Sequence, residues 1–333
     1  MGQRATPRAL GLLVGGALAA AGGVGAAAAE TWDMPMAYAA SNFHSETGAA
    51  FARCVTTGTG GDIEVVTHPS GALFGGADIK RAVQTGQVPI GERLLSAHQN
   101  EDPLFGIDSI PFLATSFEEA EVLWDIAEGP MRALLEEQNL HLLYSVPWPP
   151  QGLYFDREVD ALDDMQGVKF RSYNAATARL AELAGMTPVQ IEAAEISQAF
   201  ATGVAEAMIS SGATGYDRKV WESLSHFYTV NAWLPRNYVF ANLDAWNDLD
   251  SATREVFEGC AELAAYAGYW RSRQYTDFTT NQLAENGMTV APPSAQLEAE
   301  LQEIGATMTE EWLVEAGEAG AAVIEEFRAR TGG

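Results

Sequence analysis

The chain has 333 residues, of which 47% are hydrophobic, and its 45 acidic residues outnumber 19 basic ones for a net charge of −26. This negative charge would repel nucleic acid and anionic lipid, so we expect no nucleic acid partner. Its length exceeds that of one typical hydrophobic core and predicts two domains.

The N-terminus has the composition of a secretory signal peptide. Arg4 and Arg8 precede an apolar run at 9–24, and three alanines at 27–29 offer a cleavage site. We therefore expect a signal peptide over residues 1–29, cleaved near Ala29, and a periplasmic protein. A membrane anchor is the alternative, but the apolar core is shorter than the ~20 residues that a span needs. No lipobox cysteine is present, which disfavours a lipoprotein or sensor-partner role.

The first part of the exported chain alternates between strand and helix patterns. β-Branched and apolar runs indicate strands, and cap residues and glycines bound the helices between them. We predict strands at 31–37, 63–67 and 88–91 and helices at 43–57 and 77–85. This alternation is typical of an α/β domain with a parallel sheet, and 105–112 continues it.

The second part repeats the alternation and ends in long helices. A helix at 116–139 and a strand at 142–146 lead to the stiff turn 147–150, and a second α/β unit runs from Gly152 to about Trp233. We further predict a strand at 236–243, a helix at 250–287, a strand at 288–290 and two amphipathic helices at the end. The helix at 250–287 would be roughly 54 Å long, so it should span both domains.

The order of the predicted strands and helices suggests where the chain passes from one domain to the other. We assign residues 30–150 and about 236–270 to domain I, and residues 151–235 and about 271–333 to domain II. No internal repeat or low-complexity linker separates them, so we expect several short connections between the domains.

The common catalytic and metal-binding patterns are missing from the sequence. The segment Gly71–Gly76 lacks the Gly-Lys-Ser/Thr ending of a phosphate loop, and no Gly-x-Ser-x-Gly elbow occurs. The histidines are scattered and form no i, i+4 metal pair. Acidic pairs such as Glu118-Glu119 fit a solvated surface, although sequence alone leaves open a hydrolase with two inward carboxylates. Cys54 and Cys260 could form a disulfide in an oxidising compartment or stay apart.

Arg171 is the strongest candidate for a binding residue. It ends a short apolar strand that contains Val168 and Phe170, so it should lie at the carboxyl edge of a sheet, where α/β folds bind ligands. A guanidinium is a fork-shaped receptor for carboxylates. The alternative is a structural salt bridge to an Asp or Glu. A second apolar strand, Met208 to Ser211, ends in hydroxyls that could donate to a carboxylate or only turn the chain.

Several aromatic residues lie near predicted strand ends or loops, where they could be core or could contact an apolar part of a ligand. They are Phe43, Trp148, Tyr154, Tyr216 and Trp233.

At these residues the chain resembles the periplasmic solute-binding subunit of TRAP transporters, the dicarboxylate-binding-protein-like family. The resemblance covers nearly all of the exported chain and rests on several segments together: 57–65, the Gly-rich turn 71–76, Ile-Pro-Phe-Leu at 110–113, Asp-Met-Gln-Gly-Val-Lys-Phe-Arg at 164–171, 195–206 and the long helix at 250–287.

The resemblance implies an α/β, two-domain periplasmic binding protein fold with a long domain-spanning helix. It also implies that Arg171 pairs with a substrate carboxylate and that the partners are a small organic acid and TRAP membrane permease subunits. It implies no enzyme activity, cofactor or metal. The alternatives are a secreted hydrolase with a carboxylate pair and an ABC-type solute receptor.

Two departures from the family pattern point to the ligand. The chain has Gly-Leu-Tyr at 152–154 where the family often has Gly-Phe-Arg, and hydroxyls at Ser210 and Ser211 where the family often has an acid and an amide. With one arginine instead of two, we expect a monocarboxylate with an apolar or aromatic part.

We assign the binding site on these grounds. Arg171 would bind the carboxylate bidentately, and Asn174, Ser210 and Ser211 would add hydrogen bonds. We expect Phe43, Trp148, Tyr154, Tyr216 and Trp233 to contact the apolar part, with Glu92 and Gln151 as further polar contacts.

Overall fold

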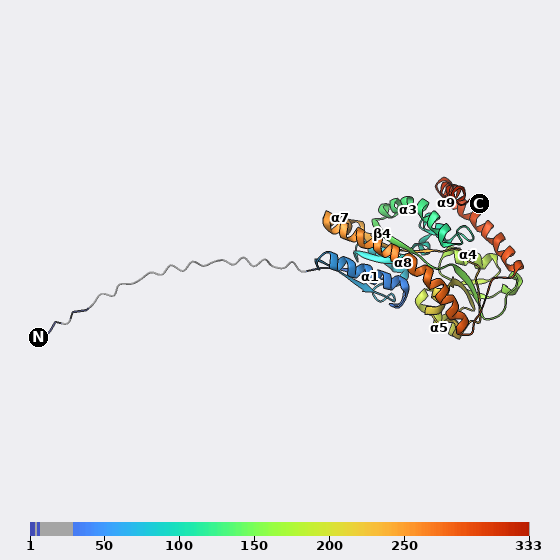
Figure 1. The fold of residues 1–333 in the computed structure, drawn as a ribbon, viewed down its shortest axis with the longest axis horizontal. Helices are drawn as coiled ribbons and strands as arrows, with labels where there is room; N and C mark the ends of the chain where they lie inside the picture. Colours follow the sequence, from blue (N-terminus) through green and yellow to red (C-terminus); the bar gives the residue numbers. More distant parts are fainter. Residues whose placement is uncertain (4, 7–28, 333) are drawn as a thin grey trace.

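The computed structural model describes residues 1–3, 5–6 and 29–332 (Figure 1). Most of the predicted signal peptide therefore lies outside the described residues. The helices are α1 (Phe43–Gly58), α2 (Gly76–Gln84), α3 (Phe117–Glu137), α4 (Ala175–Leu183), α5 (Ile196–Ala201), α6 (Gly212–Asp217), α7 (Leu243–Asp248), α8 (Ser251–Glu285) and α9 (Ala295–Thr331). Among the helices of the described residues, none combines the length and the hydropathy that crossing a membrane requires.

Two small sheets form the centre of what we call the first lobe. The strands β1 (Glu30–Pro35) and β2 (Ile63–His68) pair in parallel, and a single parallel bridge from Met36 to Glu92 links them to the next sheet. That sheet has the order β3 (Ile90–Leu94), β10 (Arg236–Asn242), β4 (Leu140–Pro147), and β10 is antiparallel to both neighbours.

The predicted parallel pairing holds for β1 and β2, but the β3–β10–β4 sheet of this lobe is antiparallel. β10 belongs to the returning part of the chain, and it enters the sheet from the direction opposite to β3 and β4. Hydrophobic patterns identify a buried strand but carry no information on its direction. The segment 105–112 also differs, because Asp102 caps a 3-10 helix at Pro103–Ser109 in place of a strand.

A six-stranded mixed sheet forms the centre of the second lobe. Its order is β11 (Thr289–Ala291), β9 (His226–Tyr228), β5 (Gln151–Phe155), β8 (Ala207–Ser211), β6 (Lys169–Ser172), β7 (Thr187–Gln190). β6 runs parallel to β8 and β7, whereas β5 is antiparallel to β8 and β9. The carboxyl ends of β6, β7 and β8 therefore meet at one edge.

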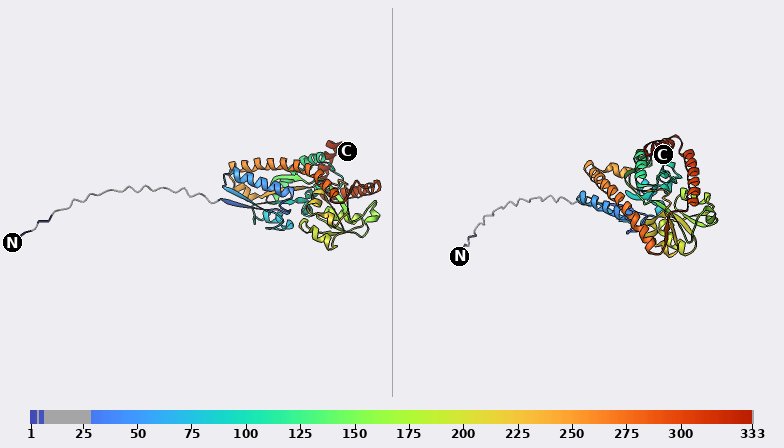
Figure 2. Two further views of the ribbon diagram at one scale, coloured as in Figure 1. Left: turned by 60° about the horizontal axis from the view of Figure 1, so that its bottom comes forward. Right: turned by 45° about the vertical axis from the view of Figure 1, so that its right-hand side comes forward.

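The chain crosses between the lobes at Pro147–Gln151, at 229–235, along α8 and along α9. α8 is a 35-residue helix that packs on α1 and β4 of the first lobe and on α6 of the second (Figures 1 and 2). Gly268 lets α8 approach β4 closely, since a Cβ there would overlap the Val146 side chain. The long predicted helix is therefore present and in contact with both lobes.

Cys54 of α1 and Cys260 of α8 form a disulfide with a Cα–Cα distance of 5.8 Å. The sequence left this pairing open. The bond fixes the N-terminal half of α8 to the first lobe.

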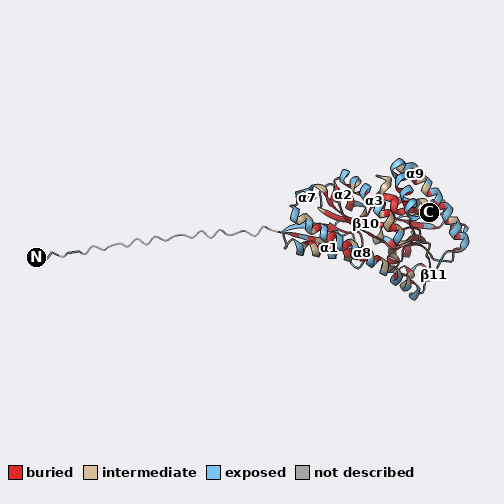
Figure 3. Ribbon diagram, turned by 45° about the horizontal axis from the view of Figure 1, so that its top comes forward, coloured by how far each residue is buried: buried red, intermediate tan, exposed pale blue. Residues whose placement is uncertain are grey.

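α9 contains a break at Gly317, which has φ 60° and ψ −149°, so the two predicted C-terminal helices are both present. Its first part packs in the second-lobe core through Leu297 and Leu301, whereas Val323 and Phe327 pack against α3. The predicted second domain includes about 271–333, whereas the end of the chain packs on α3 of the first lobe. The buried residues concentrate inside both lobes and along their junction (Figure 3).

Candidate functional site

A small cavity lies between the two lobes and takes its walls from both. Its volume is about 40 Å³, enough for a few water molecules, so a larger ligand requires the lobes or the lining side chains to move. The lining residues are Tyr38, Arg93, Leu94, Trp148, Gln151, Arg171, Tyr173, Glu192, Ala193, Ser210, Thr214 and Pro235.

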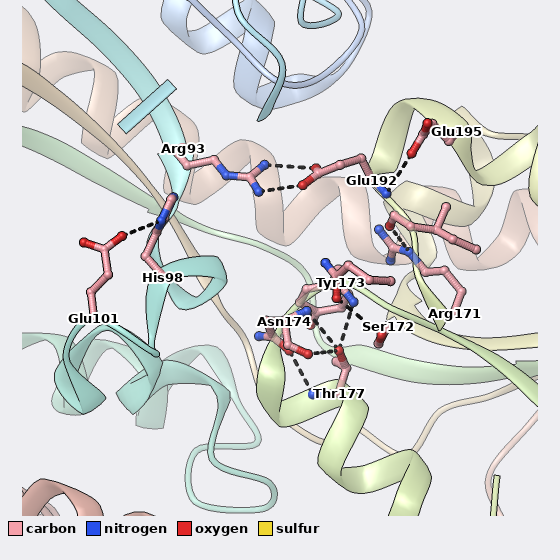
Figure 4. A network of polar contacts seen from close by, with 12 residues as sticks. Arg93, His98, Glu101, Arg171, Ser172, Tyr173, Asn174, Thr177, Glu192 and Glu195 are labelled. Carbon is pink, nitrogen blue, oxygen red and sulfur yellow. Dashed lines mark hydrogen bonds and ion pairs between the residues drawn. The ribbon is translucent and has the colours of Figure 1, made fainter. Parts of the chain in front are cut away.

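Arg171 is the unpaired cation of this cavity. It lies on β6 and is 3% exposed, and its Nε donates a 2.9 Å hydrogen bond to the Ile191 carbonyl oxygen (Figure 4). Its carbon Cζ lies 5.0 Å from the centre of the Tyr173 ring. Among the described residues, Arg171 forms no ion pair, and its terminal nitrogens have no hydrogen-bond acceptor. Its position therefore suits bidentate capture of a carboxylate.

Burial lowers the pKa of the Arg171 guanidinium to about 10. The group nevertheless remains protonated at neutral pH. A buried positive charge without a hydrogen-bonded counterion is costly, and an anionic ligand would remove that cost.

A second arginine in the cavity already has a partner. Arg93 of β3 and Glu192, which follows β7, form a two-fold hydrogen-bonded ion pair with distances of 3.0 and 3.2 Å (Figure 4). The pair joins the two lobes directly. The Arg93 side chain is 5% exposed and that of Glu192 is 34% exposed. The pair therefore lies at the border between the buried cavity and solvent.

The first residue of α2 lies against this ion pair. A Cβ at Gly76 would overlap Nη1 of Arg93 and would lie 2.9 Å from Oε2 of Glu192. The absence of a side chain at Gly76 thus lets the backbone of the Gly-rich turn approach both groups. This gives a structural reason for glycine in the turn 71–76, which the sequence analysis had excluded as a phosphate loop.

A chain of hydrogen bonds orients the aromatic wall. Trp233 donates from Nε1 to the Tyr173 hydroxyl at 3.0 Å, and that hydroxyl lies 3.3 Å from Oε1 of Gln151. Nε2 of Gln151 donates to the Pro149 carbonyl, which fixes the amide. Burial raises the pKa of the Tyr173 hydroxyl, so it stays protonated and able to donate.

Tyr38 faces the two arginines from the first lobe. Burial raises its pKa to about 12, although Arg93 and Arg171 act in the opposite direction. Its ring meets that of Trp148 edge-on at 4.9 Å. The cavity thus combines an open guanidinium with the phenol donor of Tyr38 and an indole surface.

A buried polar group supports Trp148 from behind. Trp148 donates from Nε1 to Oδ1 of Asn237 at 2.8 Å, and Nδ2 of Asn237 donates to Oε1 of Glu92 at 2.9 Å. Glu92 is 2% exposed, and burial raises its pKa to about 7. His44 approaches the same carboxylate at 3.7 Å, and burial lowers its pKa well below the usual value.

Of the residues that the sequence predicted for the site, Arg171, Trp148, Gln151 and Ser210 line the cavity. The backbone brings them together because β5, β6 and β8 are neighbours in one sheet and Trp148 precedes β5 in the crossing segment.

Three predicted polar residues lie outside the lining and have local partners. Asn174 caps α4 and donates to the Ser96 hydroxyl of the first lobe at 3.0 Å. Ser211 caps α6, and Glu92 lies behind Trp148 as described above. These residues hold elements in place at the edge of the cavity.

The other predicted aromatic residues also lie outside the lining. Phe43 packs edge-on against Trp148 at 5.3 Å, and the Tyr154 hydroxyl donates to the Ser211 carbonyl oxygen. Tyr216 packs against Phe278 of α8, and Trp233 lies behind Tyr173. They form the layer that supports the lining.

Five further lining residues were not predicted from the sequence: Tyr38, Arg93, Tyr173, Glu192 and Thr214. For Arg93 a signal existed, because two adjacent charges interrupt the fully buried strand Ile90–Leu94. The others reach the cavity through loops and helix starts, which carry no periodic signal.

The donor set of the cavity suits an organic anion. Among the described residues that line it, Glu192 alone carries a carboxylate, so it lacks the carboxylate pair of a glycosidase. No cluster of metal-ligating side chains occurs among the described residues.

Comparisons with known proteins place the chain in a family context. The family model described as bacterial extracellular solute-binding protein, family 7, matches residues 36–315. A solved TRAP solute-binding protein from a marine metagenome, described as specific for pyroglutamate and in complex with co-purified pyroglutamate, is 53% identical. The match covers 90% of this chain and 99% of that chain with a TM-score of 0.89.

Two further relatives are similar. The Bordetella pertussis extracytoplasmic solute receptor DctP6, which binds pyroglutamic acid, is 40% identical over 90% of this chain and 99% of that one, with a TM-score of 0.88. A monocarboxylate 2-oxoacid-binding periplasmic protein of Nostoc is 23% identical over 62% of this chain. The chain spans about half the length of the curated relatives it matches, 46% and 58%.

Proposed function

The chain belongs to family 7 of the bacterial extracellular solute-binding proteins, and we propose that it is the receptor of a TRAP transporter for a small monocarboxylic acid. The ligand we favour is a compact ring acid such as pyroglutamate, bound in the cavity between the lobes. The receptor would act in the periplasm after loss of residues 1–29 and would deliver its ligand to membrane permease subunits.

The unpaired guanidinium of Arg171 carries this proposal. Its guanidinium is buried, held by Ile191 and left without an acidic partner among the described residues. The surrounding lining offers the Tyr38 hydroxyl as a donor and Trp148 as an apolar surface. A carboxylate on a small ring would satisfy Arg171 and fill the space beside the aromatic groups.

Closure of the lobes would strengthen this pairing. Removing water from the cavity lowers the local dielectric, so one guanidinium–carboxylate pair contributes more to binding there than at the surface. The crossings at Pro147–Gln151 and 229–235 are short and would serve as hinges.

A thermal-shift screen followed by calorimetry tests the proposal. The panel contains pyroglutamate, pyruvate and 2-oxobutanoate as monoacids, and succinate and glutarate as diacids of similar size. A ligand that binds only the folded protein raises its melting temperature. We expect one or more monoacids to raise it and the diacids to leave it unchanged. A screen in which only diacids bind, or in which the protein turns over a ligand, contradicts the proposal.

A further inference from the structure

We infer that Glu192 sets the ligand class of this receptor, because it makes the cavity selective for a monoanion that carries an N–H donor and against dicarboxylates. This inference rests on the proposed function, since it assumes that an organic acid occupies the cavity. Glu192 is not among the site residues predicted from the sequence.

The charge of the cavity lining favours a monoanion. Arg93 and Arg171 contribute two positive charges, and Glu192 contributes one negative charge. The described lining therefore has a net charge of +1, which a monocarboxylate neutralises. A dicarboxylate would leave an excess negative charge in a desolvated site, where an unpaired charge is costly.

Only one of the two guanidinium groups that line the cavity has free terminal nitrogens among the described residues. Arg93 uses both terminal nitrogens on Glu192, whereas Arg171 uses only Nε, on the Ile191 carbonyl. A ligand with two carboxylates would have to displace Glu192 from Arg93 to find a second fork. That exchange leaves the Glu192 carboxylate without its main partner, so it offers little net gain.

The Arg171 guanidinium and the Glu192 carboxylate are held by adjacent residues of the same loop. Ile191 accepts the hydrogen bond from Arg171, and Glu192 is the next residue in the chain. The peptide unit between Ile191 and Glu192 therefore links the site that holds the Arg171 guanidinium to the Glu192 carboxylate, which can accept a hydrogen bond (Figure 4). Each carboxylate oxygen of Glu192 accepts one hydrogen bond from Arg93 and can accept a second from another donor. A compact acid with an N–H near its carboxylate matches both groups.

The experiment compares ligands within each variant by calorimetry. The probes are pyroglutamate, glutarate and 5-oxotetrahydrofuran-2-carboxylate, a lactone that replaces the ring N–H of pyroglutamate with an oxygen. For the wild type we expect pyroglutamate to bind at least 100-fold more tightly than glutarate and at least 10-fold more tightly than the lactone. Glu64→Gln removes an exposed carboxylate on β2 that does not line the cavity, and should leave both ratios unchanged.

Glu192→Gln should reduce both preferences at least 10-fold. The amide removes the negative charge, frees Arg93 for a second carboxylate, and can turn its NH₂ group toward the lactone oxygen. A ratio between two ligands on the same variant cancels any effect on folding or closure that both ligands share. Ratios within twofold of the wild-type values in Glu192→Gln overturn the inference.

A double variant separates charge from local damage. Arg93→Gln combined with Glu192→Gln returns the lining to a net charge of +1, so the preference over glutarate should recover to within a few-fold of the wild type. A double variant that binds glutarate as well as pyroglutamate overturns the charge argument, even where the single variant fails to fold. Wild-type protein that binds none of the monoacids contradicts the proposed function itself, which is a different outcome.

Discussion

Arg171 and Ile191 are joined by a 2.9 Å hydrogen bond from the guanidinium Nε to the carbonyl oxygen. The acceptor lies beyond β7, the strand that neighbours β6 in the sheet. This bond fixes the plane of the guanidinium and leaves its two terminal nitrogens free of internal acceptors among the described residues. A planar fork held in this way is prepared to bind a carboxylate before the ligand arrives.

Replacing Arg171 tests this relationship. We expect Arg171→Ala to weaken ligand binding by ~2–5 kcal/mol, a loss of roughly 30-fold or more, because a buried carboxylate would lose its partner. Arg171→Lys keeps the charge but lacks the fork and should recover only part of the affinity. Calorimetry with the best monoacid measures both, and Arg157→Ala, an exposed arginine, is the matched control. Equal affinity in Arg171→Ala and the control would rule out this role.

Gly76 should be intolerant of a side chain. In Gly76→Ala the added Cβ would overlap Nη1 of Arg93 and crowd Glu192, so the interlobe ion pair must shift. We expect ligand affinity to fall about tenfold, on the order of 1.4 kcal/mol. Gly75→Ala is the matched control, because its Cβ would meet Asp78 at an ordinary 3.7 Å. The prediction fails if the two alanine variants bind the ligand equally well.

The buried Glu92 should make stability depend on pH. Burial raises its pKa to about 7 from an ordinary value of 4.5, so the folded protein holds this proton more tightly than the unfolded chain. Below about pH 4.5 Glu92 is protonated in both the folded and the unfolded protein and does not change the free energy of unfolding. Between pH 4.5 and 7 the free energy of unfolding falls as pH rises. Above pH 7 it is lowered by the full penalty, on the order of 3 kcal/mol.

Glu92→Gln removes this dependence while keeping an acceptor for Asn237. The free energy of unfolding of the wild type, measured by urea denaturation, should therefore decline relative to Glu92→Gln as pH rises from 4.5 to 7. Glu64→Gln controls for the loss of a surface carboxylate. A difference between wild type and Glu92→Gln that stays constant over this range, or that grows in favour of the wild type, contradicts the prediction.

The Cys54–Cys260 disulfide should stabilise the first lobe without taking part in binding. It closes a loop with a sequence separation of 206 residues, and neither cysteine lines the cavity. We expect Cys54→Ser with Cys260→Ser to lower the free energy of unfolding by ~2–5 kcal/mol. Ligand affinity at 25 °C should remain within twofold. Reduced wild type serves as the comparison, and a double variant as stable as the oxidised wild type would show the prediction to be wrong.

Much of the fold followed from local chemistry. Cap residues, glycine stops and apolar periodicity predicted α1, α3 and α8 close to their observed bounds, because these signals act within one or two turns of the chain. The strand β10 was predicted at its observed place, but its antiparallel direction was not, because strand direction depends on how the chain returns from the other lobe. The end of α9 was predicted to belong to the second domain, but it packs on α3 of the first lobe. This contact also depends on the path of the chain between the lobes, which local patterns do not record.

The sequence by itself determined that a buried strand carries Arg171 to a sheet edge. The apolar residues of that strand and the helix cap at Asn174 lie within a few positions of Arg171, so a local pattern is enough to predict them. Only the tertiary structure decided which groups meet that guanidinium. Glu192 pairs with Arg93, 99 positions away, and so does not neutralise Arg171. Such pairing depends on the approach of two lobes, and no local pattern in the chain records the distance between them.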